Sequence, residues 1–282
     1  MEEFNIDILE RIHAAYFQLT AAERRVADYV FAQHEQVQLM SITQLAEECG
    51  TAEATVSRFC RSLQLKGFNA FKIELAHHCV SAVQTPHAKP ADAVVAQSLE
   101  TGRLAIDAVQ GTVELVNPKL IRKAVQIIEK SAHVHCMGTG GSMIMAHECS
   151  YMFSTVSGKF FAIYDSHIQM STAATTDQHD AIILFSYSGA THNCLRILEL
   201  AKSRSVRTIL VTRFHNSPAA KLADVVLCCG SNEGPFQVGS IPARIAQLVV
   251  VDVLFQEYFR RNRAQCEENI QNIDSALSGM HL

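Results

Sequence analysis

The stretch HVHCMGTGGSMIMA, residues His133–Ala146, is the starting point for interpreting the second half of the chain. An apolar run over 133–137 is followed by three glycines and a serine, and a new apolar run follows them. This pattern predicts a buried strand, an open loop over Gly138–Ser142 and the start of a helix. Backbone amides and the helix dipole favour an anion there, and glycines let the anion approach the main chain. We therefore expect an anion-binding loop at this position.

Four more short apolar runs follow, with longer amphipathic segments between them, at 160–163, 181–185, 207–211 and 224–228. Five strands with helical crossovers predict an α/β domain built on a doubly wound, five-stranded parallel sheet. A long last helix is expected from Ser240 to about Asn262. In such sheets ligands bind at the carboxyl ends of the strands.

A second loop, SYSGAT, follows the third predicted strand over Ser186–Thr191 and also opens a helix. Its hydroxyl groups, together with helix amides, suit a phosphate monoester that is bound without a lysine or a metal ion. The loops after strands one and three lie side by side at the switch point of a doubly wound sheet. One loop could then hold a sugar and the other its phosphate.

Two nucleotide-binding alternatives bear on the first loop. A GxGxxG dinucleotide-binding fingerprint would need glycine at position 143, where this chain has Met143. Asp165 follows the second strand, where such a fingerprint has an acidic residue, so nucleotide binding is weakened as an interpretation but is not excluded. A P-loop is excluded for this loop because no Gly-Lys-Ser/Thr follows the glycines.

The first 80 residues predict helices alone. Thr20 with Glu23, and Ser41 with Gln44, fit capping boxes. A helix over Ile42–Cys49, a tight turn at Gly50–Thr51 and a helix over Ala52–Leu63 then predict a helix-turn-helix, with Thr51 as the N-cap of the second helix. Three apolar residues, Ala46, Val56 and Phe59, are expected to pack the two helices together.

The opposite face of the second helix is suited to DNA. Small, hydroxylated and basic side chains near a helix N-terminus can enter the major groove and reach bases and phosphates. The positive charge of residues 51–73 is opposed by Glu53 alone, whereas residues 1–50 are acidic. An ordinary helical hairpin with a solvated face is the alternative. The predicted DNA-binding residues are Thr51, Glu53, Ala54, Thr55, Ser57, Arg58, Arg61 and Lys66.

Length and composition limit the classes of protein to consider. The chain has 282 residues, a net charge of −4 and 48% hydrophobic residues, which favours two domains. We expect a helix-turn-helix domain over 1–84, a linker over 85–92 that contains Pro86 and Pro90, and an α/β domain over 93–282. The acidic N-terminus and scattered cysteines without a CxxC pair predict a cytoplasmic protein, and the uncharged apolar runs are too short to span a membrane.

The motifs resemble one known family. The domain over 93–282 resembles the sugar isomerase (SIS) domain, which binds phosphosugars, in its two loops GTGGS and SYSGAT. The chain also resembles RpiR-family bacterial transcription regulators in three stretches: LTAAERRVADYV, SITQLAEECGTAEATVSRFCRSLQLKGFNAFK and ARIAQLVVVDVL. The resemblance implies phosphosugar contacts from Ser142, Ser186, Ser188 and Thr191, and DNA reading by Ala52–Arg61. The chain departs from the family at Pro242-Ala243, where Ser-Ser is frequent, and at Gln237, where arginine is frequent.

Two functions from different classes follow. The first is a phosphosugar-controlled DNA-binding regulator, most simply a repressor of a carbohydrate-utilisation operon, that acts as a homodimer or tetramer without a cofactor or metal ion. The second is an aldose–ketose phosphosugar isomerase, for which Glu148, His167 and Glu233 are candidate acids and bases. An isomerase needs no helix-turn-helix, so we predict the regulator. Its predicted ligand-binding residues are Gly140, Gly141, Ser142, Ser186, Ser188, Gly189, Thr191, His167 and Glu233.

Overall fold

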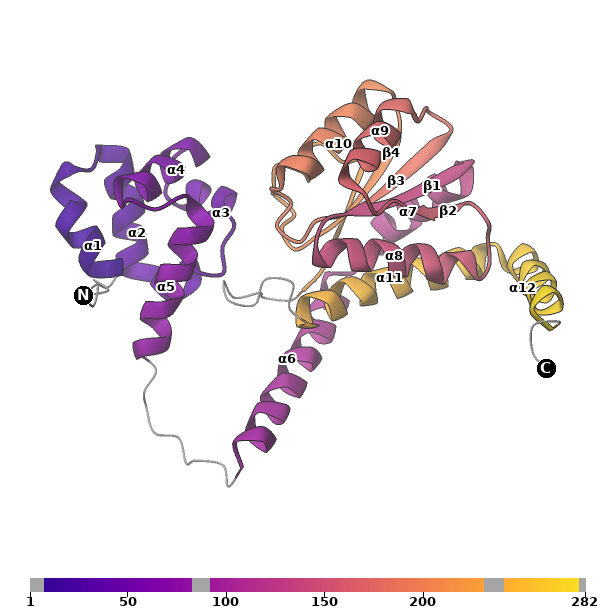
Figure 1. Ribbon diagram of the computed structural model, residues 1–282, viewed down its shortest axis with the longest axis horizontal. Coiled ribbons are helices and arrows are strands. Elements are labelled where there is room, and N and C mark those ends of the chain that lie inside the picture. Colours follow the sequence, from indigo (N-terminus) through magenta and orange to yellow (C-terminus); the bar gives the residue numbers. More distant parts are fainter. Residues whose placement is uncertain (1–7, 83–91, 231–240, 279–282) are drawn as a thin grey trace. The chain divides into compact units, whose positions relative to one another are not determined.

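The computed structural model describes residues 8–82, 92–230 and 241–278, apart from a few side chains in these ranges. The chain forms two compact units, and the boundary between them falls inside one long helix, α6 (Ala93–Leu115). Each unit is described by itself (Figure 1). The predicted linker, 85–92, lies outside the described residues except for Asp92.

The first unit is helical, as predicted. Its elements are α1 (Ile8–Ala15), a 3-10 turn η1 (Tyr16–Gln18), α2 (Ala21–Val37), α3 (Ile42–Glu48), α4 (Glu53–Ser62) and α5 (Phe68–Ala82). Both capping boxes are present, Thr20 with Glu23 at the start of α2 and Ser41 with Gln44 at the start of α3. Helix α2 continues to Val37, although Gln33 has non-helical backbone angles. The core comprises Val30, Leu45, Val56, Phe59 and Phe71, all fully buried.

Glu23 connects the start of α2 to the end of α4. Its buried carboxylate accepts hydrogen bonds from the Thr20 amide (2.9 Å) and hydroxyl (2.7 Å), and from the Ser62 hydroxyl (3.3 Å). Burial alone would raise the pKa of Glu23, but the Thr20 and Ser62 hydrogen bonds and the Arg58 charge outweigh burial and hold the pKa below its ordinary value. The ionised carboxylate therefore stabilises the folded helical unit.

Glu23→Gln should lower the free energy of unfolding by about 1 kcal/mol at neutral pH, because the amide cannot replace a charged acceptor. The native contribution is complete above the ordinary glutamate pKa of 4.5 and is lost as the pH falls through the lower pKa of the folded state. Urea unfolding across this pH range should therefore show a smaller loss of stability for the variant than for the wild type. Parallel pH profiles would contradict this assignment. Glu35→Gln, at an exposed position of the same helix, is the control.

The second unit contains the predicted five-stranded, all-parallel sheet, in the order β2-β1-β3-β4-β5. Each strand begins and ends within one residue of the predicted position. After α6, the elements are α7 (Pro118–Lys130), β1 (His133–Gly138), α8 (Gly141–Ser154), β2 (Phe160–Ala162), α9 (Ser166–Thr175), β3 (Asp180–Phe185), α10 (His192–Ser203), β4 (Arg207–Thr212), β5 (Val225–Cys228), α11 (Ile241–Arg261) and α12 (Arg263–Leu277).

Helices cover both faces of this sheet. Side chains of α7, α8 and α11 form one apolar core with the sheet, and those of α9 and α10 form a second core on the opposite face (Figure 1). The strands alternate between the two cores, so that Val134 and Cys136 of β1 face the first and Met137 faces the second. No helix among the described residues has the length and apolarity to cross a membrane.

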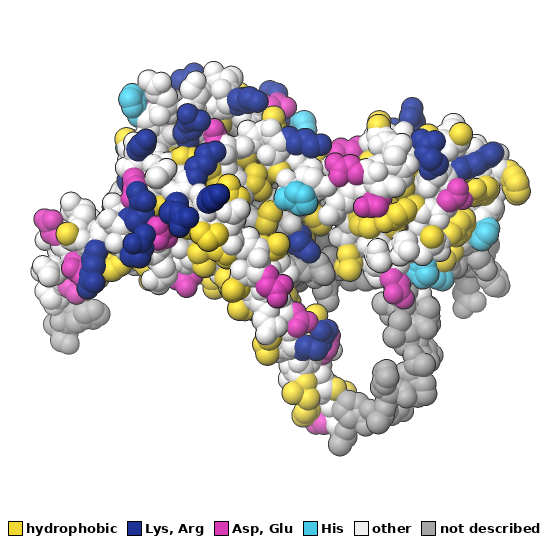
Figure 2. Space-filling model, turned by 180° about the vertical axis from the view of Figure 1, so that it is seen from behind, with side chains coloured by type: hydrophobic (Ala, Val, Ile, Leu, Met, Phe, Trp, Pro, Cys, Tyr) yellow, Lys and Arg dark blue, Asp and Glu magenta, His cyan; other side chains and the backbone are white. Residues whose placement is uncertain are grey.

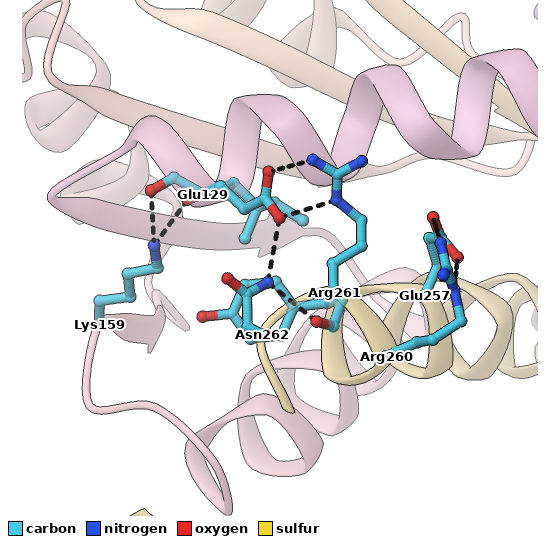
Figure 3. A network of polar contacts seen from close by, with 8 residues as sticks. Glu129, Lys159, Glu257, Arg260, Arg261 and Asn262 are labelled. Carbon is cyan, nitrogen blue, oxygen red and sulfur yellow. Dashed lines mark hydrogen bonds and ion pairs between the residues drawn. The ribbon is translucent and has the colours of Figure 1, made fainter. Parts of the chain in front are cut away.

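Helix α12 was not predicted, and a polar network holds its start. Arg261 makes a two-pronged ion pair with Glu129 at the end of α7 (2.8 and 2.9 Å), and the Asn262 amide donates to the same carboxylate (3.1 Å) (Figure 3). The Lys159 ammonium donates to the carbonyl groups of Ile128, Glu129 and Ser131, which closes the C-terminus of α7. These contacts join α7, β2 and the junction of α11 and α12.

The C-terminal part of α6 touches the end of β5 backbone to backbone. A Cβ atom at Gly230 would overlap the carbonyl group of Gly111 and the amide nitrogen of Thr112. The Gly230 amide donates to the Thr112 hydroxyl (3.0 Å), which in turn donates to the Ala108 carbonyl (2.6 Å). Both glycines are therefore required by the close approach of the two segments.

Candidate DNA-binding and ligand-binding sites

The turn between α3 and α4 is closed by backbone hydrogen bonds. Gly50 has a φ of +58°, its amide donates to the Glu47 carbonyl (3.0 Å), and the Thr51 amide donates to the Ala46 carbonyl (2.8 Å). This pattern is a Schellman motif, which ends a helix and redirects the chain. The Arg25 guanidinium of α2 donates to the carbonyl groups of Cys49 and Gly50 (3.2 and 3.3 Å) and holds the turn in place.

Helix α4 presents an exposed face, as predicted, but with fewer residues. Ala54, Arg58 and Arg61 are exposed and Ser57 is half-buried, whereas Ala46, Val56 and Phe59 pack in the core. The prediction that Thr55 lies on the exposed face is wrong: its side chain is buried and accepts a hydrogen bond from Arg58 (3.2 Å).

Two other predicted DNA-binding residues, Glu53 and Thr51, lie at the turn between α3 and α4. The half-buried Glu53 accepts a hydrogen bond from the Thr43 hydroxyl (2.7 Å), which links α4 to α3. Thr51 does not cap α4, because the N-cap is Ala52, which makes no side-chain capping bond. Lys66, after α4, is exposed. The predicted DNA-binding residues that are accessible are therefore the small side chains of Ala54 and Ser57 and the cations Arg58, Arg61 and Lys66.

The loops after β1 and β3 are neighbours, as predicted, because β1 pairs directly with β3. Gly138 ends β1 beside Phe185, the last residue of β3, so Ser142 in the first turn of α8 and Ser186 directly after β3 both lie at the carboxyl edge of the sheet. Gly140 is the N-cap of α8, with a φ of +56°. A Cβ atom at Gly138 would meet the Ser142 carbonyl oxygen at 2.7 Å, so the tight loop needs glycine there.

The two helices that start at these loops lack side-chain caps. Neither Gly140 at the start of α8 nor Thr191 at the start of α10 makes a side-chain capping bond. In contrast, Asn117 caps α7 and Asp165 caps α9. Helix N-termini have free amide donors and a positive dipole end, so the two uncapped starts at adjacent loops suit an anion.

The loop after β3 is tightly packed and rich in hydroxyl groups. The Ser186 hydroxyl is buried and lies 3.3 Å from that of Thr191. Gly189 has a φ of +59°, and a Cβ atom there would overlap Ser217. The Ala190 amide donates to the Ser188 hydroxyl (3.3 Å). Burial raises the pKa of the Cys194 thiol to about 11, although hydrogen bonds with Ser186 and Thr191 oppose the rise, so the thiol beneath the loop is neutral.

Gln169 of α9 ties the edge together and was not predicted. Its buried amide nitrogen donates to the carbonyl groups of Gly138 (2.8 Å) and Ile163 (2.7 Å). Gly138 is the last residue of β1, and Ile163 directly follows β2. Its amide oxygen accepts from Asn193 in the first turn of α10 (3.3 Å). One side chain thus connects the ends of β1 and β2 with the start of α10.

The other predicted ligand-binding residues are His167 and Glu233, and the alternatives considered for this domain involve Glu148 and Asp165. His167 is exposed in the first turn of α9, after β2. Glu148 is half-buried in the second turn of α8, and Glu233 lies outside the described residues. Asp165 accepts hydrogen bonds from the His167 and Ile168 amides (both 2.9 Å), so it serves as the N-cap of α9. This role accounts for Asp165 without a nucleotide.

Arg213 is a cation at the same edge that the sequence analysis did not single out. It follows β4, its amide donates to the Tyr187 carbonyl (3.0 Å), and its guanidinium lies over the Phe214 ring. An arginine directly after a buried strand is the signal that could have identified it.

Both units match known protein families. Residues 6–82 match the model of the helix-turn-helix domain of the rpiR family, and residues 127–256 match the model of the SIS domain.

Curated relatives are similar over most of the chain. YbbH of Bacillus subtilis, an HTH-type transcriptional regulator, is 30% identical, with 86% of this chain and 87% of the relative covered. An HTH-type transcriptional regulator of Caldanaerobacter subterraneus is 29% identical, with 96% and 97% covered. Among solved structures, the Vibrio vulnificus NanR protein complexed with ManNAc-6P has a TM-score of 0.86 and 24% identity, with 98% of this chain and all of that chain covered. This last likeness establishes a shared fold.

Proposed function

Because the chain belongs to the rpiR family of HTH-type transcriptional regulators and carries a SIS domain, we propose that it is a DNA-binding repressor controlled by a phosphosugar. The operator is bound by the exposed face of α4. The phosphosugar is bound at the carboxyl edge of the sheet, between the loops after β1 and β3. The proposed domains are 1–84 for DNA and 93–282 for the phosphosugar, joined by 85–92, and the regulator acts in the cytoplasm.

One observation carries the ligand assignment. Two helices without side-chain caps start at adjacent strands, and hydroxyl groups of Ser142, Ser186, Ser188 and Thr191 accompany them. Amides and hydroxyls supply several donors for phosphate oxygens without a metal ion, and no cluster of metal ligands occurs among the residues that the structure describes. NanR, which has the same fold, is complexed with ManNAc-6P, which supports the phosphosugar class.

Ser142→Ala, Ser186→Ala and Ser188→Ala should each weaken phosphosugar binding by about 1–3 kcal/mol, because each removes a donor to a charged oxygen. Titration calorimetry with a ligand found in a thermal-shift screen of sugar phosphates measures the loss, with inorganic phosphate as a reference. Ser203→Ala, at an exposed position of α10, is the matched control. Unchanged affinity in all three loop variants would contradict the site.

Arg58→Ala should weaken operator binding and reduce the salt dependence of log K by about one unit, because one phosphate contact is lost. Fluorescence anisotropy at several salt concentrations measures both quantities. Arg196→Ala, on the exposed surface of α10, removes the same charge away from α4 and should change neither. If Arg58→Ala and Arg196→Ala behave alike, α4 does not contact DNA.

The regulator is proposed to act as a homodimer, because one recognition helix reads only a few base pairs and a two-fold operator needs two. The phosphosugar should change operator affinity by about 5–150-fold, the usual range of allosteric coupling, in the direction of release.

The protein is proposed not to turn its ligand over. Neither of the two described candidate residues, Glu148 and His167, lies in the loops that would bind the phosphate: Glu148 is in the second turn of α8 and His167 is in the first turn of α9. Incubation with the bound phosphosugar, followed by NMR of the aldose and ketose forms, tests this. Conversion that His167→Ala or Glu233→Gln abolishes would instead make the protein an isomerase.

A further inference from the structure

Helix α6 carries a continuous stripe of exposed apolar side chains. Val95, Leu99, Ile106, Val109 and Val113 are between 38% and 72% exposed, and Gly102 completes the series. The steps between these six positions alternate between four and three residues, which is the spacing of a helix-pairing seam. Hydrophobic side chains are visible along this helix in Figure 2.

The stripe is separate from the side of α6 that packs on its own unit. The buried residues Ala108 and Thr112, together with Gly111 against Gly230, define the packed side. At 100° per residue, they lie on the opposite side of the helix from the stripe. The stripe therefore remains exposed after α6 has docked on the sheet.

We propose that this stripe is the contact between two copies of the chain, with α6 paired antiparallel to α6 of the second copy. The inference rests on the homodimer of the proposed function and assigns its surface. Pairing two such helices buries on the order of 1,000 Å², near the lower limit for a specific protein interface. A monomer rarely exposes an apolar surface of this length.

The stripe itself favours the antiparallel arrangement. The six stripe positions are spaced symmetrically about residue 104. A two-fold axis at residue 104 therefore places each stripe position of one helix opposite a stripe position of the partner helix. Val95 then faces the partner's Val113, and Gly102 faces the partner's Ile106. In a parallel pair the two Gly102 positions would face each other and leave a void, which close packing disfavours.

Leu99→Glu and Ile106→Glu test the surface. Each should raise the dimer dissociation constant roughly 100-fold or more, as expected when a charge enters an apolar contact at the centre of an interface. Val94→Glu is the matched control, because Val94 is as exposed as Leu99 (73% against 72%) but lies off the stripe. Sedimentation velocity of the full chain, without DNA or sugar, gives the oligomeric state, and far-UV circular dichroism checks folding.

Three outcomes are distinguishable. A wild-type dimer that only the stripe variants dissociate supports the proposal. A wild-type dimer that persists in Leu99→Glu and Ile106→Glu overturns the proposed surface and leaves the homodimer intact. A wild-type monomer overturns both.

Cysteine crosslinking tests the orientation. The double variant Val95→Cys with Val113→Cys should form a covalent dimer under mild oxidation, whereas Val95→Cys alone should not. In the antiparallel pair the two copies of position 95 lie about 27 Å apart along the axis, at 1.5 Å per residue. Wild-type chain oxidised alongside shows any crosslinking by native thiols. A covalent dimer from Val95→Cys alone would show parallel pairing and overturn the register.

Discussion

Gln169→Leu is expected to lower the free energy of unfolding by about 3 kcal/mol, because it leaves the buried carbonyl group of Gly138 and the partly buried carbonyl group of Ile163 without their donor. The same change should abolish measurable phosphosugar binding. The ends of β1 and β2 and the start of α10 are held together by this one side chain, and a loop displaced by about 1 Å loses its hydrogen bonds to a small ligand. Urea unfolding measures the stability, and titration calorimetry measures the affinity.

The control for this prediction is Gln178→Leu, the same substitution at an exposed position of the same unit, which should change stability by about 0.5 kcal/mol at most. If Gln169→Leu binds phosphosugar as tightly as the wild type, Gln169 does not position the site. If binding is lost without a loss of stability, Gln169 instead contacts the ligand itself.

Gly230→Ala is expected to cost about 3 kcal/mol or more, because a methyl group there overlaps backbone atoms of α6 that no rotamer change can move. The Gly230–Thr112 hydrogen bond breaks when the two segments are pushed apart. Urea unfolding and the yield of folded protein measure the effect.

Gly158→Ala is the matched control, since a Cβ atom there has no neighbour within 4 Å. We expect the control to retain wild-type stability within about 0.5 kcal/mol. Equal stability of the two variants would show that α6 and β5 do not approach each other as described.

The sheet and the helix-turn-helix could be predicted because their signals are local. A parallel strand covered on both faces appears as a continuous apolar run, so each of the five runs marked a strand to within one residue. The capping boxes at Thr20 and Ser41 fixed the starts of α2 and α3 in the same way, since both partners lie within one turn. The adjacency of the loops after β1 and β3 followed from topology alone.

Features that depend on tertiary contacts could not be predicted. Gln169 lies in a short helix between Ile168 and Met170, where no local pattern distinguishes a buried glutamine from a solvated one, and only the meeting of β1, β2 and α10 buries it. Thr55 was placed on the exposed face by helical spacing, but the packing of α4 in the core buries it. The apolar residues of helix α6 extend around it, so the sequence could not tell which side packs on the sheet.

The contact between Gly111 and Gly230 has a mechanical consequence. Two backbones meet there without an intervening side chain, so no rotamer can absorb a displacement of one against the other. Gly230 follows β5 at the edge where the ligand is proposed to bind, and Gly111 lies near one end of a rod that continues to Ala93. The rod extends about 27 Å beyond the contact, at 1.5 Å per residue. A tilt of a few degrees at this contact would therefore displace the far end of α6 by on the order of 1–2 Å.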